Sequence, residues 1–423
     1  MQIDLNDFSL NTLLTQLSPE QRDQFADEVA KVVRTNMYPL KLSKLELMLT
    51  EKCNLACDYC FLGTHGQGRD MSIETAEGAV KFFLENAAEN QPLSIVHFGG
   101  EPTMALPLMK HVMDFVKVNA KPGQEISYQC TSNGTLITDE VAKFVAEYGV
   151  PVLISVDGIQ EVHDRHRKFR DGRPSFEKVM EGIQTLQKYQ GWVGARVTYT
   201  AETVDTLADS VIWLNQHGLA QFIIGAATGD TGWTEESLAR IEPQWLRIAD
   251  YYRKTRIEGQ IPLRITDFEE SLEELKNKLQ YMWGCSAGRS SLCVTADGKF
   301  YGCARFATLK DCEGDYELGN LKEGFTRFDN VRDLQENRAI ARNECFKCDL
   351  KVYCAGSCPA ASQELHDNIY CIDPSSCKTV KTKHKLLSEQ PDLCKLHIDY
   401  PIMHAHKQQP QVSDTAAEHI QPL

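Results

Sequence analysis

Short apolar runs alternate with amphipathic stretches along most of the chain after residue 44. Six of these runs predict strands, at 45–50, 94–98, 126–131, 151–156, 194–200 and 220–225. Between them, apolar positions recur at helical spacing, at 73–89, 105–119, 138–148, 175–189 and 205–217. A strand followed by a helix, repeated in this way, predicts an α/β fold with a parallel sheet and helices outside it.

The same pattern leaves the shape of the sheet open. Right-handed crossovers can curl a parallel sheet into a full or partial barrel, but periodicity does not separate that barrel from a doubly wound sheet. Helical patterns continue at 236–258 and 269–282, on either side of a predicted short strand at 261–265. Beyond residue 284 the chain changes to cysteines, glycines and short strands, so we predict a domain boundary near 260–284.

The two ends of the chain differ from the middle. Residues 1–44 carry leucines at helical spacing, and Ser18 followed by Pro19 is typical of a helix start. We expect 1–44 to be a helical extension that caps the next domain, with a peptide-binding module as the alternative. Residues 391–423, with scattered His, Gln and Pro, are expected to be a mobile tail. The domains between them are 45–260 and 261–390.

The composition of the chain indicates which binding partners and which cellular compartment to expect. The net charge of −14 over 423 residues argues against a nucleic-acid partner held through its phosphates. No run reaches ~18 apolar residues, and the N-terminus lacks a secretory signal, so we expect a cytoplasmic protein without membrane contact. Thiols stay reduced in that compartment, and fifteen cysteines therefore indicate metal binding rather than disulfides.

Three cysteines, Cys53, Cys57 and Cys60, share the spacing C-x3-C-x2-C. A 4Fe–4S cubane needs one ligand per iron, so three thiolates leave one iron open for another molecule. A zinc knuckle and ordinary buried cysteines are the alternatives. Zinc sites more often contain C-x2-C pairs that close with a fourth Cys or His, and nothing of that kind follows until residue 285.

This pattern resembles the radical S-adenosylmethionine (SAM) superfamily. In that family the open iron chelates SAM, and cleavage of SAM gives a 5′-deoxyadenosyl radical that removes hydrogen from the substrate. Tyr59 matches the aromatic residue that the family places near the adenine. The resemblance selects a partial (β/α)6 TIM-like barrel of the radical SAM type over a doubly wound sheet.

Further motifs extend the resemblance to SAM binding. Gly99, Gly100 and Glu101 match the family's GGEP motif, whose glycines approach the amino group of methionine and whose Glu helps to organise it. Ser155 and Arg167 belong to a block that resembles S-x-D-G…H-D-x-x-R, and by that match they bind the SAM carboxylate. Ser132 lies where the family often has a turn on the ribose side.

The cysteines after residue 284 resemble a second pattern, the signature of the SPASM domain. Cys285 is followed by G-x4-C, which ends at Cys303, and then by C-x2-C-x5-C-x3-C from Cys345 to Cys358. In the family this small domain holds two auxiliary 4Fe–4S clusters. A rubredoxin-like or zinc-ribbon site would need two C-x2-C pairs, and only one is present.

The resemblance also implies which cysteines bind which cluster, for three 4Fe–4S clusters in all. The first auxiliary cluster takes Cys285, Cys303 and Cys358, with Cys293 as the candidate fourth ligand. The second takes Cys345, Cys348, Cys354 and one late cysteine. Cys371 and Cys377 compete for this place, and the sequence around Cys377 resembles the family more closely. Cys130, Cys312, Cys371 and Cys394 then remain as free thiols.

Enzymes with both domains mostly modify peptides or proteins. In the sulfatase-maturating members an Asp, taken as the base, follows the cysteine that matches Cys303, whereas this chain has Ala304. The sequence therefore favours a peptide maturase that forms a thioether or carbon–carbon crosslink in a ribosomally made precursor peptide. We expect it to use an external electron donor such as flavodoxin or ferredoxin.

Two other functions stay open at this point. A sulfatase-maturating enzyme is the alternative within the same class, and a non-catalytic iron–sulfur electron carrier is the alternative from another class. A carrier leaves Ser155, Arg167 and the GGEP motif without a role. The general base is not identified by the sequence. Asp267 is a candidate, with a purely structural carboxylate as the alternative.

Overall fold

The structure is a computed structural model. It describes residues 18–22, 24–25, 40–62, 68–190, 193–257, 263–275, 277, 285–309, 315–354 and 356–396. Most of the predicted extension 1–44 and of the tail 391–423 therefore lies outside the described residues, as does the second part of the predicted helix at 269–282. The predicted helix start at Ser18 is confirmed, because the Gln21 N–H donates to Ser18 Oγ (3.3 Å) at the head of a short helical stretch.

Seven strands follow one another in a parallel sheet, in the order of the sequence. They are β1 (Lys44–Thr50), β2 (Leu93–Gly99), β3 (Ile126–Ser132), β4 (Val152–Ser155), β5 (Gly194–Tyr199), β6 (Gln221–Ala226) and β7 (Arg264–Ile265). The six strands predicted from apolar runs are confirmed. The seventh coincides with the described part of the short strand predicted at 261–265.

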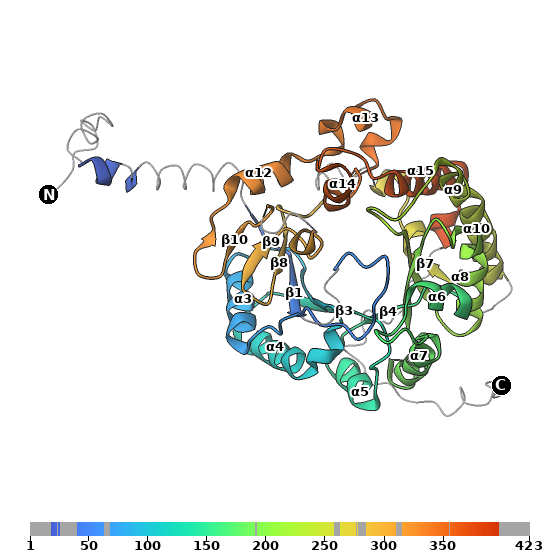
Figure 1. Ribbon diagram of the computed structural model, residues 1–423, viewed down its shortest axis with the longest axis horizontal. Coiled ribbons are helices and arrows are strands. Elements are labelled where there is room, and N and C mark those ends of the chain that lie inside the picture. The colour runs from blue at the N-terminus through green and yellow to red at the C-terminus, as the bar shows by residue number, and fades with distance from the viewer. Residues whose placement is uncertain are drawn as a thin grey trace.

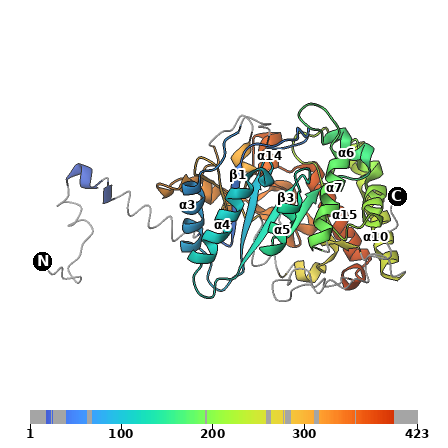
Figure 2. The ribbon, with the colours of Figure 1, turned by 90° about the horizontal axis from the view of Figure 1, so that it is seen from below.

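Helices connect these strands and cover one face of the sheet. They are α3 (Ile73–Glu85), α4 (Leu106–Asn119), α5 (Asp139–Glu147), α6 (Gln160–His166), α7 (Phe176–Gln190), α8 (Leu207–Gln216), α9 (Glu235–Ala239) and α10 (Ile241–Ile257). Figure 1 shows α3, α4, α5, α7, α8 and α10 as an arc around the strands, and Figure 2 shows α3, α4 and α5 alongside β1 and β3. The expected parallel sheet with helices outside it is therefore confirmed.

The first of these helices shows why the periodic segments fold in this way. Ser72 caps α3, since its hydroxyl accepts a hydrogen bond from the Thr75 N–H (3.1 Å). Ala76, Val80 and Phe83 then recur on one face and are fully buried against the sheet.

One predicted helix is divided in two. The pattern at 236–258 predicted a single helix, but α9 ends at Ala239 and α10 begins at Ile241. Pro243 lies in the first turn of α10 and has no N–H to donate to the carbonyl of Ala239, four residues earlier. A proline is tolerated in a first turn and disfavoured inside a helix, so a new helix starts here.

The cysteine-rich part continues the sheet of the barrel. β8 (Ser291–Val294) pairs in parallel with β1, on the side away from β2, and β9 (Lys299–Tyr301), β10 (Gly319–Asn320) and β11 (Gly324–Phe325) add antiparallel strands. The described residues thus form one eleven-stranded sheet with edges at β11 and β7. The expected six-stranded sheet was too small, because a four-residue strand that is buried throughout carries no sign of its partner in its sequence.

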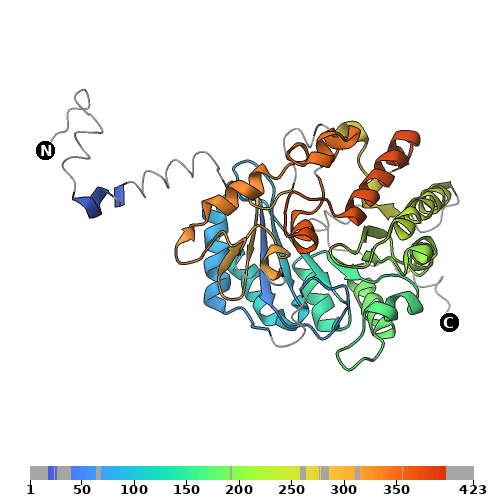
Figure 3. The ribbon, with the colours of Figure 1, turned by 45° about the horizontal axis from the view of Figure 1, so that its top comes forward.

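Short helices after β11 lead from one edge of the sheet to the other. They are α12 (Phe328–Glu336), α13 (Asn343–Phe346), α14 (Pro359–His366) and α15 (Pro374–Glu389). Figure 3 shows this orange-to-red segment passing from the side of β8–β11 to the side of α10. There α15 contacts both α10 and β6. The C-terminal segment therefore completes the ring that the open sheet leaves incomplete.

Several single-turn 3-10 helices lie in the connections. They are η2 (Pro102–Ala105), η3 (Val204–Thr206), η4 (Thr266–Phe268), η5 (Phe306–Thr308), η6 (Ala339–Ala341), η7 (Asp349–Val352) and η8 (Leu393–Leu396). Among the helices that the structure describes, none has the length and apolar content needed to cross a bilayer.

Phe300 of β9 ties the C-terminal strands to the barrel. Its ring packs against Phe82 of α3 (centroids 4.7 Å apart) and Phe325 of β11 (5.5 Å). We expect Phe300→Ala to lower the free energy of unfolding by about 3–5 kcal/mol, because the side chain is fully buried. Urea unfolding measures this, with Val118→Ala on α4, where the side chain is 82% exposed, as the control. A loss under about 1 kcal/mol would contradict this role.

Candidate functional site

Cys53, Cys57 and Cys60 lie on one loop that follows the carboxyl end of β1. Burial raises the pKa of Cys53 to about 11 and that of Cys57 to about 12, and the nearby Cys60 thiol adds to both effects. They therefore face a common space. Because metal ligation needs thiolates, three such groups in one place fit a cluster whose positive iron ions favour the deprotonated form.

The end of β2 holds this loop through its backbone. The Gly100 N–H donates to Thr50 O (2.8 Å), and the Glu101 N–H donates to Lys52 O (2.9 Å). A Cβ on Gly99 would lie 2.2 Å from Thr50 O, and one on Gly100 would lie 2.3 Å from Lys52 O. The two glycines are thus required by the close approach of the strand to the cysteine loop. Their predicted contact with methionine stays a prediction.

Glu101 is a buried carboxylate with a full set of donors. Its oxygens accept from the Thr103 N–H (3.1 Å) and hydroxyl (2.5 Å), from Ser132 Oγ (2.8 Å) and from the Asn133 N–H (2.7 Å). Burial raises its pKa, and these hydrogen bonds oppose that effect. Glu101 thus joins the end of β2 to the end of β3. Glu101 would therefore affect SAM binding by holding the two strand ends in place, since the hydrogen-bonding capacity of its carboxylate is already used.

Two asparagines connect the turn after β3 to the cysteine loop. Asn133 Nδ2 donates to Asn54 Oδ1 (2.8 Å) and lies 3.8 Å from Cys53 Sγ. Asn54 Nδ2 in turn donates to Thr135 Oγ1 (2.8 Å). The only local signal for this contact is an Asn directly after Cys53. The role of neighbouring Ser132 near a ribose stays a prediction.

Tyr59, Asp157 and Arg167 form a buried cluster beside the cysteines. Asp157 accepts hydrogen bonds from the Tyr59 hydroxyl, from Arg167 Nε (2.8 Å) and from the Thr198 N–H (3.0 Å). Burial is the largest single effect on the pKa of Asp157 and raises it, but the charges of Arg167 and His163 and the hydrogen bonds from Arg167 and Tyr59 together hold the pKa below its ordinary value. The guanidinium stands over the Tyr59 ring (5.3 Å), with Nη1 4.0 Å from Cys57 Sγ. Sequence reasoning missed Asp157 as the hub.

Arg196 is a second cation that sequence reasoning missed. It is the register partner of Ser155 on the next strand, so the two side chains share a face of the sheet. Burial lowers its pKa, while Asp267 and Asp157 raise it. Among the described residues its guanidinium has no hydrogen-bond or ion-pair partner. The available signal was a charged residue inside an otherwise apolar parallel strand. A guanidinium in this place can take a carboxylate.

Asp267 lies in η4, at the edge of the same space. Lys383 of α15 donates to Asp267 Oδ1 (2.5 Å), while Oδ2 is buried without a hydrogen-bond partner among the described residues. An ion pair with Lys383 favours the structural alternative over a free base. Its role as the base stays a prediction.

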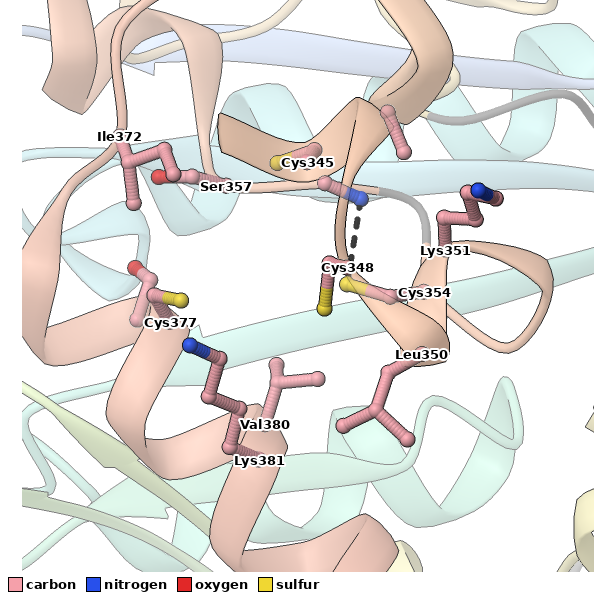
Figure 4. Close-up of a pocket in the computed structure, with 13 residues that line it drawn as sticks. Cys345, Cys348, Leu350, Lys351, Cys354, Ser357, Ile372, Cys377, Val380 and Lys381 are labelled. Atoms are coloured by element: carbon pink, nitrogen blue, oxygen red, sulfur yellow. Dashed lines mark hydrogen bonds between the residues drawn. The ribbon is translucent and has the colours of Figure 1, made fainter. Parts of the chain in front are cut away.

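The second group of C-terminal cysteines surrounds one cavity (Figure 4). Cys345 of α13, Cys348 and Cys354 on either side of η7, and Cys377 of α15 all line it, whereas Cys371 does not. Asp373 caps α15 by accepting from the Ser376 N–H (2.7 Å), which places Cys377 one turn into the helix. Four thiols around one cavity fit a cubane and favour Cys377 over Cys371.

The other group lies next to β1. Besides burial, Cys358 raises the pKa of Cys285, and Cys285 and Cys358 both raise that of Cys303, so these three thiols are close together. Cys293 is fully buried in β8 and interacts with Cys303 and Glu46, but the same effect does not link it to Cys285 or Cys358. The support for Cys293 as a member of this cysteine group is therefore weaker than for the other three. Within the described residues, no three His, Cys, Asp or Glu side chains meet closely enough for a single metal ion.

Glu46, on β1, is a further residue that the sequence did not single out. Its carboxylate accepts from the Ala304 N–H (2.8 Å) and pairs with Lys44 (2.5 Å), next to Cys303. The parallel pairing of β8 with β1 creates this contact, and no sequence motif indicates it. A carboxylate thus lies beside the residue that follows Cys303.

Comparison with known families agrees with this geometry. The model of the Radical SAM superfamily matches residues 47–214, from β1 through α8. The chain contains a radical SAM domain. Such a domain implies a 4Fe–4S cluster and SAM, and the cysteine loop and the cluster around Asp157 lie within the matched residues.

Relatives of this radical SAM chain are enzymes. The cyclopropyl synthase TigE of Paramaledivibacter caminithermalis is 22% identical over 85% of this chain and 77% of its own length. The cysteine-type anaerobic sulfatase-maturating enzyme of Clostridium perfringens is 26% identical over 78% and 93%. The serine-type enzyme of Bacteroides thetaiotaomicron is 39% identical, but over only 32% of this chain and about a third (34%) of its own length. An enzyme is thus favoured over a carrier.

Solved structures share the fold of this radical SAM chain. The structure of anSMEcpe with bound AdoMet gives a TM-score of 0.69 at 22% identity, over 87% of this chain and 99% of that one. SuiB of Streptococcus suis bound to its precursor peptide SuiA gives 0.58 at 15% identity, over 89% and 84%. Both likenesses extend past the barrel into the cysteine-rich part.

The contact of Gly100 with the cysteine loop is testable. A Cβ at this position displaces Lys52 and with it the loop, so we expect Gly100→Ala to lose about four irons per chain after anaerobic reconstitution. Gly78→Ala in α3, where a Cβ would meet nothing closer than 3.6 Å, is the matched control and should keep the parent iron content. Full iron content in Gly100→Ala would show that the loop tolerates the shift.

Proposed function

We propose that this radical SAM enzyme is a peptide maturase, which removes hydrogen from a ribosomally made precursor peptide and closes a thioether or carbon–carbon crosslink. The observation that carries the proposal is Ala304. It is buried directly after Cys303, where an alanine provides no acid or base. A reaction that needs a carboxylate at this position is therefore disfavoured, and a coupling reaction is favoured.

The first site would be assembled from the loop after β1. Cys53, Cys57 and Cys60 would hold one 4Fe–4S cluster, and Ser155 with Arg167 would bind the SAM carboxylate. Bound cluster and SAM together supply a 5′-deoxyadenosyl radical for hydrogen abstraction. In this arrangement Asp157 fixes Arg167 through Nε and leaves its outer nitrogens toward Cys57. Arg196 adds a second cation beside Ser155, available to the carboxylate of SAM or of the peptide.

The C-terminal cysteines would hold two auxiliary clusters. Cys285, Cys303 and Cys358 would bind the first, with Cys293 as the candidate fourth ligand. Cys345, Cys348, Cys354 and Cys377 would bind the second, which their common cavity supports. We propose residues 261–390 as the unit that carries both. These clusters would accept the electron left on the coupled product, and an external donor would reduce the first cluster.

The relatives support a peptide substrate and a coupling reaction. SuiB is seen with a precursor peptide, and the relative TigE is a cyclopropyl synthase. Closing a cyclopropane ring joins two carbon atoms within one molecule, which is a carbon–carbon coupling. The proposed crosslink belongs to the same kind of chemistry, with two hydrogens lost for each bond formed.

A sulfatase-maturating activity is the second candidate. Glu46 favours it, because its carboxylate lies 2.8 Å from the Ala304 N–H and supplies an acid–base group that Ala304 lacks. The relatives from Clostridium perfringens, matched over most of their length, point in the same direction. Product analysis separates the two candidates.

The number of clusters can be counted directly. The anaerobically reconstituted protein should contain about twelve irons per chain, because three cubanes hold four each. Changing Cys53, Cys57 and Cys60 together to Ala should leave about eight. Cys130→Ala, which alters a buried thiol outside all three groups, should leave the count unchanged. About four irons in the parent would refute the two auxiliary clusters.

The product decides the reaction. With SAM and a reductant, we expect the cognate precursor peptide to become two hydrogens lighter by mass spectrometry, and a sulfatase-motif peptide to gain no formylglycine. The precursor is sought among short open reading frames beside the gene. An aldehyde on the sulfatase peptide, formed as fast as 5′-deoxyadenosine, would falsify the crosslinking proposal. Glu46→Gln would then test the carboxylate beside Ala304.

A further inference from the structure

Arg342 is among the largest side chains that the fold buries completely. It lies just before α13 and is 1% exposed. Nη2 donates to Asn337 Oδ1 (2.5 Å) and Nη1 to the carbonyl of Cys371 (3.3 Å), while Nε is buried without a partner among the described residues. A guanidinium carries a full charge at any physiological pH, so this cation needs negative charge nearby.

No carboxylate supplies that charge. Within the part of the chain that the structure describes, Arg342 forms no ion pair with Asp or Glu, and its two hydrogen-bond acceptors are neutral. Burial lowers the pKa of Arg342, and the charges that oppose this effect belong to Cys345, Cys358, Cys354 and Cys285. Two of these four cysteines belong to each auxiliary group.

The backbone places Arg342 between the two groups. Its own position precedes Cys345 by three residues, and its guanidinium lies against Gly356, where a Cβ would be 3.4 Å from Cζ. Gly356 stands between Cys354, which lines the cavity of the second group, and Cys358, which belongs to the first. One cation therefore faces ligands of both proposed clusters.

We propose that Arg342 is the shared counter-charge of the two auxiliary clusters and that it raises the reduction potential of both. The inference rests on the proposed clusters. A cubane with four thiolates is an anion, and its reduction adds one electron and no proton, so a fixed positive charge nearby stabilises the reduced form. Arg342 keeps its proton throughout and is a positioning residue for charge, not a ligand.

The test uses the full chain with Cys53, Cys57 and Cys60 changed to Ala, so that only the auxiliary clusters contribute. Iron content is measured first, and the midpoint potentials follow from redox titration monitored by electron paramagnetic resonance. The variants are Arg342→Gln and Arg342→Lys. The control is Arg332→Gln on α12, an exposed arginine paired with Asp329 and Asp333.

We expect Arg342→Gln to shift both potentials to more negative values, Arg342→Lys to stay near the parent, and Arg332→Gln to change nothing. If Arg342→Gln loses its iron while Arg342→Lys keeps it, the need for charge is also supported. Unchanged potentials, equal shifts in Gln and Lys, a shift of one cluster alone, or equal iron loss in both variants would overturn the inference. The proposed clusters are checked separately: the protein with Cys53, Cys57 and Cys60 changed to Ala and Arg342 intact should contain about eight irons.

Discussion

The close approach of two strand ends is the constraint on which the candidate site depends. The last residues of β2 pass so near the loop after β1 that Gly99 and Gly100 have no room for a Cβ. The contact is between backbones, through Gly100 to Thr50 and Glu101 to Lys52. Glu101 and Asn133 then extend it to the end of β3. The cysteine loop, which alone would be free to move, is thereby fixed from two neighbouring strands.

A second backbone pairing, of β8 with β1, determines where the first group of C-terminal cysteines lies. β8 lies against β1, so Cys293 faces Glu46 and the segment around Cys303 comes to the inner side of the sheet. The same strand therefore carries the loop with the first cysteines at its end and borders the first auxiliary group along its length. The residues proposed to hold the first cluster and the first auxiliary cluster are therefore attached to one continuous sheet.

Much of this was predictable from the sequence, for reasons that are local. Apolar residues recur every two positions in a strand and every 3.6 in a helix, and this pattern can be recognised from neighbouring residues. β1 through β6 and the helices between them could therefore be located. The cysteine spacings are local as well. The pairing of β8 with β1 was missed because its register joins residues far apart in the sequence, such as Glu46 and Cys293. Asp157 and Arg196 were missed for a related reason: Asp157 shows its role only through donors on other elements, and Arg196 only through its place beside Ser155 on the neighbouring strand.

Two buried arginines, Arg167 and Arg342, differ in how their charge is balanced. Arg167 has a buried carboxylate, Asp157, at 2.8 Å, and the pair needs no further ion to be tolerated inside the protein. Arg342 is buried as deeply, yet its neighbours are an amide, a backbone carbonyl and four cysteines. If those cysteines were neutral thiols, the fold would bury a cation at a cost of several kcal/mol, with only two hydrogen bonds to neutral acceptors to offset it. If they are thiolates of anionic clusters, the same arginine is a stabilising element. The burial of Arg342 beside four cysteines is thus consistent with the proposed auxiliary clusters.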